Sequence, residues 1–410
     1  MYSIKRLCRA PFVLFLALFF TSPFAFAAAF QLYELGTPIV GSAGVGQAAV
    51  ANDASTSYFN PAGMVELKSS QYLLGSQIIA PSTQFSIGGQ NTILGNNGGN
   101  AALLTPGASL YYVNNYSSKV KFGVSFTTPY GGFLNYNDGW VGRYNVQNVQ
   151  LYALNLNPSL AYKINEQIAL GAGIAIEYVN LQQTVALPIP ETPLVDGQVN
   201  IKTSNIAPGF NLGVMLTPSQ TTKIGIAYRS RILHNLSGNT TFLRISSTPT
   251  TSTKMTMPQN IIVSLSQALT SHFNLLAELG WANWASMKNT IVVIDGYSAT
   301  TALDWSNTYR AGIAGQFIPT PNVLLQAGAS FDSSPTTTSR RLPNLPMDRQ
   351  VRLGAGIIYS VAKAVNLGFS YEYINFGSAG INNTSSSGVL AGSYSRNFAN
   401  VLQASVNVVC

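Results

Sequence analysis

The stretch IALGAGIAIEY, residues 168–178, decides the fold class of this chain. Apolar residues, all but Ala172 large, recur at every second position, and small residues or Glu177 stand between them. Successive side chains of a β-strand point to opposite faces, so this period of two predicts a strand with one apolar face. The same alternation returns in residues 351–359 and 365–373. The chain is therefore expected to be all-β.

Composition separates a membrane barrel from a soluble sandwich. Charged residues make up only 9% of the chain, against roughly 25% in ordinary soluble domains. Beyond residue 27, no apolar run approaches the roughly 20 residues that a transmembrane helix needs. A membrane barrel combines low charge with short alternating strands, because its outer face meets lipid and its inner face is polar. Aromatic residues near predicted strand ends match the interfacial girdles of such barrels: Tyr178, Tyr228, Trp281, Tyr359 and Tyr373.

The alternating segments and the turns between them predict a transmembrane antiparallel β-barrel of about 14 strands. The strands are expected at 71–87, 107–114, 119–128, 150–163, 167–185, 206–217, 222–242, 256–270, 272–294, 303–318, 322–333, 349–361, 363–376 and 396–410. Short turns alternate with long loops at 88–106, 129–149, 186–205, 243–255, 295–302, 334–348 and 377–395. This asymmetry is typical of bacterial outer-membrane barrels, which have short periplasmic turns and an even number of strands.

The N-terminus has the features of a cleaved secretory signal peptide, residues 1–27. A basic start with Lys5, Arg6 and Arg9 precedes an apolar run, and Ala25-Phe26-Ala27 forms a small-x-small cleavage site. Its removal leaves Cys410 as the single cysteine, so no internal disulfide is expected. These features predict export to the outer membrane of a Gram-negative bacterium.

Residues 28–69 differ from the rest of the chain. They are rich in glycine and alanine and keep neither a period of 2 nor one of 3.6. A compact leader before a long β array suggests an N-terminal hatch, or plug, in the lumen of a barrel formed by residues 70–410. The turn sequence Asn60-Pro61-Ala62 lies within it, although such a tripeptide by itself also occurs in ordinary turns.

An ordered set of motifs along the mature chain resembles the FadL/TodX family of outer-membrane transporters for long-chain fatty acids and other hydrophobic compounds. The resemblance implies a fourteen-stranded barrel with a hatch, an interior pocket for a hydrophobic molecule, and sideways release through a gap beside the third strand. The motifs are Ala28-Ala29-Phe30-Gln31-Leu32, Asn60-Pro61-Ala62, Phe122-Gly123-Val124-Ser125 with Tyr130-Gly131, Tyr228-Arg229-Ser230, Trp284-Ala285-Ser286, Phe331-Asp332-Ser333-Ser334-Pro335 and Pro346-Met347-Asp348-Arg349.

The resemblance places the lateral opening at Pro129, Tyr130, Gly131 and Gly132. Proline donates no hydrogen bond to a neighbouring strand and glycine permits a bend, so this stretch suits an interrupted wall. The alternative is that the third strand ends here and a loop begins. Phe30 matches the family residue that reaches the ligand pocket; alternatively it packs only within the hatch.

Further candidates for ligand contact lie in a loop and on the strands. Leu187, Ile189, Leu194 and Val195 give an outer loop apolar character and suggest an entrance groove, unless they pack on one another or on lipopolysaccharide.

A fatty acid would favour a cation beside its carboxylate, but the basic residues of the family pocket have no counterpart in 181–184, which reads LQQT. Arg310, Arg349 and Arg352 are the candidate substitutes. Arg352 is also interpreted as part of a lumenal charge network with Glu278 and Glu372.

The leading hypothesis is a transporter of hydrophobic molecules, with long-chain fatty acids as the first choice of substrate. An open porin for small polar solutes and a channel for aromatic hydrocarbons remain alternatives. A lipid hydrolase would have only His234 and His272 as imidazole bases, and neither lies in a Ser/His setting, so no catalytic residue is expected.

Several partners are not expected from the sequence. No metal-ligand spacing or cofactor motif is present, and the dispersed positive charges do not suggest nucleic-acid binding. The expected partners are a hydrophobic ligand, outer-membrane lipid and lipopolysaccharide, with the protein as a monomer.

Overall fold

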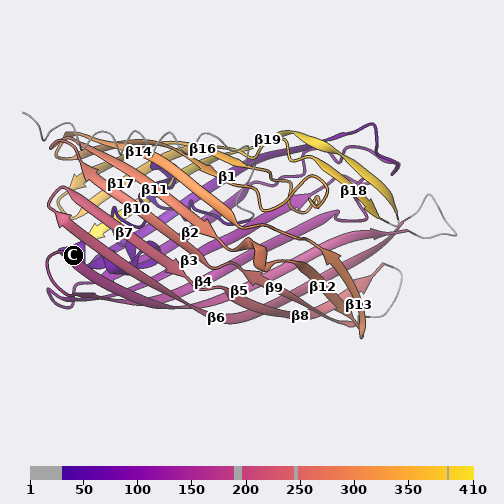
Figure 1. The fold of residues 1–410 in the computed structure, drawn as a ribbon, viewed down its shortest axis with the longest axis horizontal. Coiled ribbons are helices and arrows are strands. Elements are labelled where there is room, and N and C mark those ends of the chain that lie inside the picture. Colours follow the sequence, from indigo (N-terminus) through magenta and orange to yellow (C-terminus); the bar gives the residue numbers. More distant parts are fainter. Residues whose placement is uncertain (1–29, 189–195, 244–247, 386) are drawn as a thin grey trace, which may run out of the picture.

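The computed structural model describes residues 30–188, 196–243, 248–385 and 387–410. The predicted signal peptide lies outside these ranges. Within them the chain forms nineteen strands in one sheet, and Figure 1 labels most of them. The strands are β1 (Gln71–Ile87), β2 (Thr105–Asn114), β3 (Val120–Asn135), β4 (Asn148–Lys163), β5 (Ile168–Leu187), β6 (Gly197–Ser219), β7 (Thr222–Arg229), β8 (Ile232–Phe242), β9 (Thr250–Met257), β10 (Asn260–Ala268), β11 (Phe273–Ala282), β12 (Asn289–Ile294), β13 (Tyr297–Ala302), β14 (Thr308–Thr320), β15 (Val323–Asp332), β16 (Gln350–Ala362), β17 (Val365–Asn375), β18 (Ile381–Ser385) and β19 (Gly388–Val409).

Fourteen of these strands close into an antiparallel barrel. Going round the ring, β1 to β7 are followed by β10, β11, β14 to β17 and β19, and β19 pairs back onto β1. The remaining strands β8, β9, β12, β13 and β18 extend the wall toward the long loops, at the right in Figure 1. The prediction of an all-β, fourteen-stranded antiparallel barrel is confirmed. No helix in the described ranges is both long and apolar enough to span a membrane.

The barrel wall has its apolar side chains outside and its polar side chains inside. Along β1, Leu74 is 58% exposed whereas Gln77 is 6% exposed. In the stretch that opened the sequence analysis, Ile174 is 61% exposed on the outer face and Glu177 is buried in the lumen. A soluble sheet would bury Ile174, so this inverted arrangement is that of a barrel surrounded by lipid.

Several strands extend beyond their predicted ends. The third strand continues past Pro129 to Asn135, β6 already begins at Gly197, and β9 begins at Thr250. The predicted loops 295–302 and 377–395 contain β13 and β18. The apolar alternation stops where lipid contact ends, but backbone pairing between neighbouring strands continues, because it does not depend on side-chain polarity.

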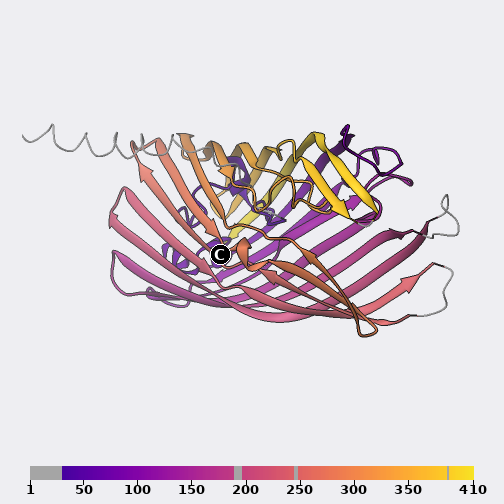
Figure 2. The same cartoon turned by 45° about the vertical axis from the view of Figure 1, so that its right-hand side comes forward.

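Three predicted strands are interrupted. The expected strand 222–242 divides into β7 and β8, the strand 256–270 divides into β9 and β10, and the strand 272–294 is broken by the short helix η3 (Trp284–Ser286). The wall is therefore interrupted at these three points, and beyond η3 the hairpin of β12 and β13 projects from the barrel, as its brown strands show in Figure 2.

The N-terminal segment 31–67 lies inside the ring of strands, in the half near the short turns. It contains η1 (Pro38–Ser42), α2 (Thr56–Phe59) and η2 (Pro61–Glu66). Its backbone is hydrogen-bonded to lumenal side chains around the barrel: Gln77 of β1 to Gly36 N at 2.5 Å, Ser264 of β10 to Ala48 N at 3.1 Å, and Ser159 of β4 to Ser57 O at 3.3 Å. Figure 2 shows this segment, in indigo, enclosed by the strands.

Candidate functional site

Glycines on the inner wall make room for the N-terminal segment. A Cβ atom added to Gly225 of β7 would collide with the backbone of Ala48, and one added to Gly75 of β1 would collide with Gly36. At Gly213 of β6 it would collide with Asn60. At Gly225 and Gly75 backbone approaches backbone, so only glycine fits there, and at Gly213 the side chain of Asn60 occupies the space.

The Asn60-Pro61-Ala62 turn connects the segment to itself and to the wall. Asn60 is fully buried and caps η2: its side-chain oxygen accepts a hydrogen bond from Ala62 N at 3.1 Å. Its side-chain amide donates to Ala48 O at 2.7 Å and to Val214 O of β6 at 3.0 Å. Pro61 occupies the first helical turn, where a missing N–H costs nothing.

A buried charge network joins Glu34 to the wall. Arg352 of β16 forms an ion pair with Glu34 and lies 3.3 Å from Glu372 and 3.5 Å from Asp332. Burial by itself would raise the pKa of Glu34, but Arg352 outweighs this effect and holds that pKa below its ordinary value. The ion pair between Glu34 and Arg352 therefore joins the N-terminal segment to β16.

Arg310 belongs to the same network. Its guanidinium pairs with Asp332 at 2.6 Å and with Glu278 at 3.0 Å, and donates to Ala43 O at 2.6 Å. Glu278 in turn accepts hydrogen bonds from Gly46 N at 3.0 Å and Gln47 N at 3.1 Å. The predicted lumenal charge network is thus present, with Arg310 as one of its members.

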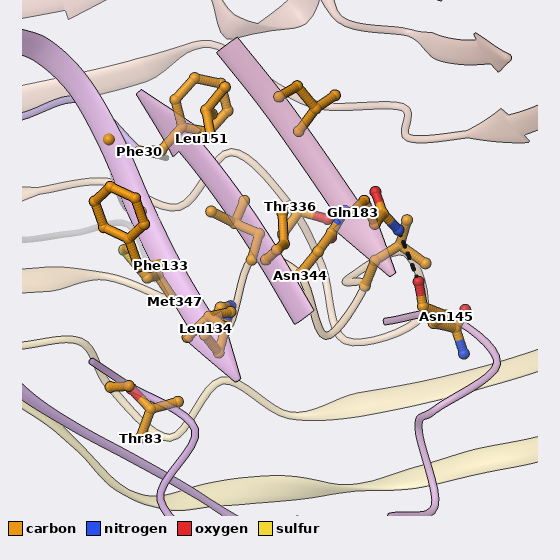
Figure 3. Close-up of a pocket in the computed structure, with 18 of the residues that line it drawn as sticks. Phe30, Thr83, Phe133, Leu134, Asn145, Leu151, Gln183, Thr336, Asn344 and Met347 are labelled. Atoms are coloured by element: carbon orange, nitrogen blue, oxygen red, sulfur yellow. Dashed lines mark hydrogen bonds between the residues drawn. The ribbon is translucent and has the colours of Figure 1, made fainter. Parts of the chain in front are cut away.

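A cavity of about 370 Å³ lies beyond the N-terminal segment, toward the long loops. Figure 3 shows part of its lining. Every lining residue that the structure describes is uncharged: Phe30, Leu32, Ile79, Pro81, Thr83, Ala102, Thr105, Gly131, Gly132, Phe133, Leu134, Tyr144, Asn145, Val149, Leu151, Leu181, Gln183, Ile201, Met255, Met287, Thr290, Val292, Thr301, Leu303, Trp305, Thr336, Leu342, Asn344, Leu345, Pro346, Met347, Phe376 and Asn397. Size and lining are those of a site for a hydrophobic small molecule.

Phe30 lies at the inner end of the cavity within an aromatic cluster. Its ring packs against Trp284 at 5.0 Å, Tyr130 at 6.0 Å and Trp305 at 6.3 Å between centroids. The structure thus places Phe30 both in the N-terminal segment and on the cavity surface, so the two alternatives that the sequence left open are compatible.

The wall beside β3 is not closed by strand pairing. β2 pairs with β3 only over residues 110–114 and 122–126, although β2 itself continues to Thr105 along β1. Contact resumes farther out, at the bridge between Ala102 and Leu134. Between these points the ladder from β3 to β4 also shifts register, between Thr127 and Tyr130.

The predicted opening residues lie at this interruption. The N-terminal segment bonds to the free side of β3, from Leu32 N to Pro129 O at 2.9 Å and from Gly131 N to Phe30 O at 3.0 Å. Gly131 and Gly132 line the cavity, and a Cβ atom at Gly132 would have no atom within 4 Å. The cavity therefore reaches a stretch of wall where β3 pairs with residues 30–32 and not with β2.

The structure does not bring the other candidates to the cavity. Leu187 is half-exposed at the end of β5 and is absent from the lining, while Ile189, Leu194 and Val195 lie outside the described residues. Arg310 is held in the charge network, and Arg349 is exposed with Asp348 at 3.9 Å. Neither arginine lines the cavity, because the first is held among acidic partners and the second faces solvent.

Two sets of residues were not singled out from the sequence. The loop 333–349 contributes Thr336, Leu342, Asn344 and Leu345 to the lining, and its apolar residues within a polar loop were the available signal. Trp140 is fully buried and stacks on Tyr136 at 3.8 Å between centroids, in a cluster where outer loops pack on one another.

Comparison with known proteins gives consistent results. The family described as "Outer membrane protein transport protein (OMPP1/FadL/TodX)" matches residues 18–408. Outer membrane protein P1 of Haemophilus influenzae is 25% identical over 393 residues, covering 84% of this chain and 86% of the relative. A long-chain fatty acid transport protein of Escherichia coli O6:H1 is 23% identical over 395 residues, covering 85% and 87%. The crystal structure of a Pseudomonas aeruginosa FadL homologue superposes with a TM-score of 0.86 at 19% identity, covering 93% of this chain and 100% of that one.

Proposed function

The chain belongs to the OMPP1/FadL/TodX family of outer membrane transport proteins, and we propose that it carries long aliphatic molecules through its cavity and releases them sideways between β2 and β3. Family membership and the barrel place it in the outer membrane of a Gram-negative bacterium, which it crosses by its strands. Long-chain fatty acids are the class that the named Escherichia coli relative transports.

The observation that carries the proposal is a cavity with an uncharged lining that reaches a stretch of wall where β2 and β3 do not pair. An apolar chain gains roughly 0.8 kcal/mol for each methylene removed from water. A molecule that leaves through the wall beside Gly131 and Gly132 passes directly into lipid and never enters water again. The route needs no polar pore along the barrel axis.

The N-terminal segment supports this route as a hatch. It fills the lumen between the cavity and the short turns, with its polar groups bonded to the wall. The apolar side chains of the segment, such as Leu35, Phe59 and Met64, are already packed against the wall, so the side of β3 is the favourable exit. The open porin is the less favoured alternative, since polar solutes would need the hatch to leave.

Uptake of a labelled long-chain fatty acid, in a host that lacks its own transporter, tests the proposal. Gly131→Val should lower uptake about tenfold or more while the barrel remains folded, because its side chain would fill the space beside Leu32 and Leu151. Gly89→Val is the control: this outer-loop glycine has no atom within 4 Å of its Cβ position, and it is not part of the cavity lining.

Two results would overturn the proposal. Uptake equal to that of the empty vector for every hydrophobic compound tried would exclude transport. Normal uptake by folded Gly131→Val protein would exclude this exit, and a large single-channel conductance of the unmodified protein in planar bilayers would favour the porin.

A second substrate class is favoured by one observation. The inner end of the cavity is lined by Phe30 and Trp305, and Tyr130 and Trp284 pack against Phe30, an arrangement suited to ring stacking with an aromatic hydrocarbon. If toluene competes with the fatty acid for uptake at similar concentration, aromatic hydrocarbons are the better assignment.

A further inference from the structure

Polar groups in the cavity are unevenly distributed. The inner end is formed by Phe30, Leu151 and Trp305, whereas Asn145 and Gln183 lie farther toward the long loops. Gln183 donates to Asn145 O at 2.9 Å, as the dashed line in Figure 3 shows. Asn344 also lines the cavity and is exposed. An elongated amphiphile would therefore lie with its tail at Phe30 and its polar head among amides.

The arginines nearest in sequence to this polar end are already engaged. Arg143 precedes Tyr144 and Asn145, and it pairs with Asp196 at 2.6 Å and donates to Leu94 O at 2.7 Å. Arg143 and Asp196 are both absent from the cavity lining.

Arg341, beside Leu342, has even more partners. It pairs with Asp348 at 2.8 Å and donates to Gly380 O at 2.6 Å and to Met347 O at 2.9 Å. It is buried in these contacts and is absent from the lining. Arg143 and Arg341 thus bind loop carbonyl groups and carboxylates. Among the described residues, the polar end of the cavity presents only neutral groups.

A carboxylate in such a place would lose its hydration without gaining a counter-ion. Taking an unpaired ion out of water costs several kcal/mol even after relaxation, so a bound acid takes up a proton instead. Neutral amides lose little when they exchange water for a hydroxyl or carbonyl partner, because a hydroxyl can donate and accept a hydrogen bond and a carbonyl can accept one.

We propose that the cavity selects long aliphatic molecules whose polar head is uncharged, such as fatty alcohols, esters or the protonated form of a fatty acid. This inference rests on the proposed function and defines its substrate class. It also separates this chain from a carrier of fatty-acid anions, which would need a cation at the polar end.

The test uses the purified full-length protein in lipid nanodiscs and the tryptophan that lines the cavity. Brominated chains quench indole fluorescence on contact, and Trp305→Phe defines how much quenching comes from the cavity. The probes are 9,10-dibromooctadecanol and 9,10-dibromostearic acid, measured at about pH 9, where an ordinary carboxyl is ionised. The alcohol should bind about tenfold or more tightly than the carboxylate, and acid binding should strengthen as the pH is lowered.

A charge introduced at the polar end should reverse the preference. Gln183→Lys should raise the ratio of carboxylate to alcohol affinity about tenfold. Gln182→Lys is the matched control, because the neighbouring side chain is absent from the lining and points to the other face of β5. The electrophoretic shift of the folded barrel on heating verifies that each variant is folded.

The outcomes separate the two proposals. If neither probe causes quenching that depends on Trp305, the proposed binding of long aliphatic molecules fails. If both bind but the carboxylate at about pH 9 binds as tightly as the alcohol, the function stands and this inference is overturned. An equal rise in the ratio of carboxylate to alcohol affinity in Gln182→Lys would also overturn this inference, because the added charge would then act from the membrane face of β5.

Discussion

The two halves of the lumen differ in their charged side chains. Near the short turns, residues 31–67 are bound by Arg352, Arg310 and Glu278 and by backbone contact with wall glycines. Near the long loops, the cavity offers only neutral and mainly apolar side chains among the described residues. Directional bonds fix a segment in one place, whereas apolar contact is non-directional and lets a molecule slide. The first half is suited to holding and the second to passage.

The two halves meet at Phe30, Gln31 and Leu32. Phe30 and Leu32 line the cavity and bond to β3 beside the interrupted wall, and Glu34 begins the charge network only two residues later. We therefore expect a disturbance of the network to reach the opening, and a ligand at Phe30 to act on the position of the segment.

The largest effect is expected from removing the central cation of the network. Arg352→Met leaves Glu34, Glu372 and Asp332 without this partner, and a broken buried ion pair costs about 3–5 kcal/mol. The segment should leave the lumen, which limited proteolysis and a rise in single-channel conductance would detect. Arg349→Met is the control: its half-exposed ion pair with Asp348 is worth about 0–1 kcal/mol. Equal behaviour of the two variants would show that the network does not hold the segment.

A smaller effect is expected from disturbing the fit of the wall. Gly225→Val forces a side chain against the backbone of Ala48, and such overpacking costs about 1–3 kcal/mol. The urea midpoint of the folded protein should fall, with increased protease sensitivity in residues 31–67. Gly132→Val should leave the midpoint unchanged, because nothing lies within 4 Å of its Cβ position. A similar fall in the urea midpoint of Gly225→Val and Gly132→Val would mean that these glycines matter for strand formation and not for the close approach of the N-terminal segment to the wall.

The smallest effect is expected where the halves meet. Phe30→Ala removes the edge-to-face contacts with Trp284 and Tyr130, which are worth about 0.5–1.5 kcal/mol. Affinity for 9,10-dibromooctadecanol should fall about two- to tenfold, while Phe30→Leu, which keeps an apolar side chain, should retain most of it. Unchanged affinity in Phe30→Ala would remove Phe30 from the ligand site.

Part of the candidate site could be predicted from residue chemistry. Pro129, Gly131 and Gly132 indicated an interruption because proline lacks a donor and glycine lacks a side chain. The sequence did not indicate that β3 continues to Asn135 or that residues 30–32 bond to its free side. Those contacts join residues about one hundred positions apart. The local sequence of either segment does not indicate that it pairs with the other.

The arginines show the same limit. Arg310 was a reasonable candidate for a carboxylate because its charge is evident from its identity. Its partners Glu278, Asp332 and Ala43 O come from three distant segments, and only their convergence shows that the cation is already engaged. The lining residues Thr336 and Asn344 come from a loop whose inward course depends on Arg341 contacts with Asp348 and Gly380 O.

The sequence by itself determined the barrel: a period of two fixes which side chains face lipid, and alternating loop lengths fix how consecutive strands pair, because both are local properties of the chain. Only the tertiary structure decided what fills the lumen. Gly225 is in close contact with the N-terminal segment, whereas no atom lies within 4 Å of the Cβ position of Gly132. The difference depends on which residues approach each glycine from across the barrel. That approach is a long-range contact, and no local pattern of residues encodes it.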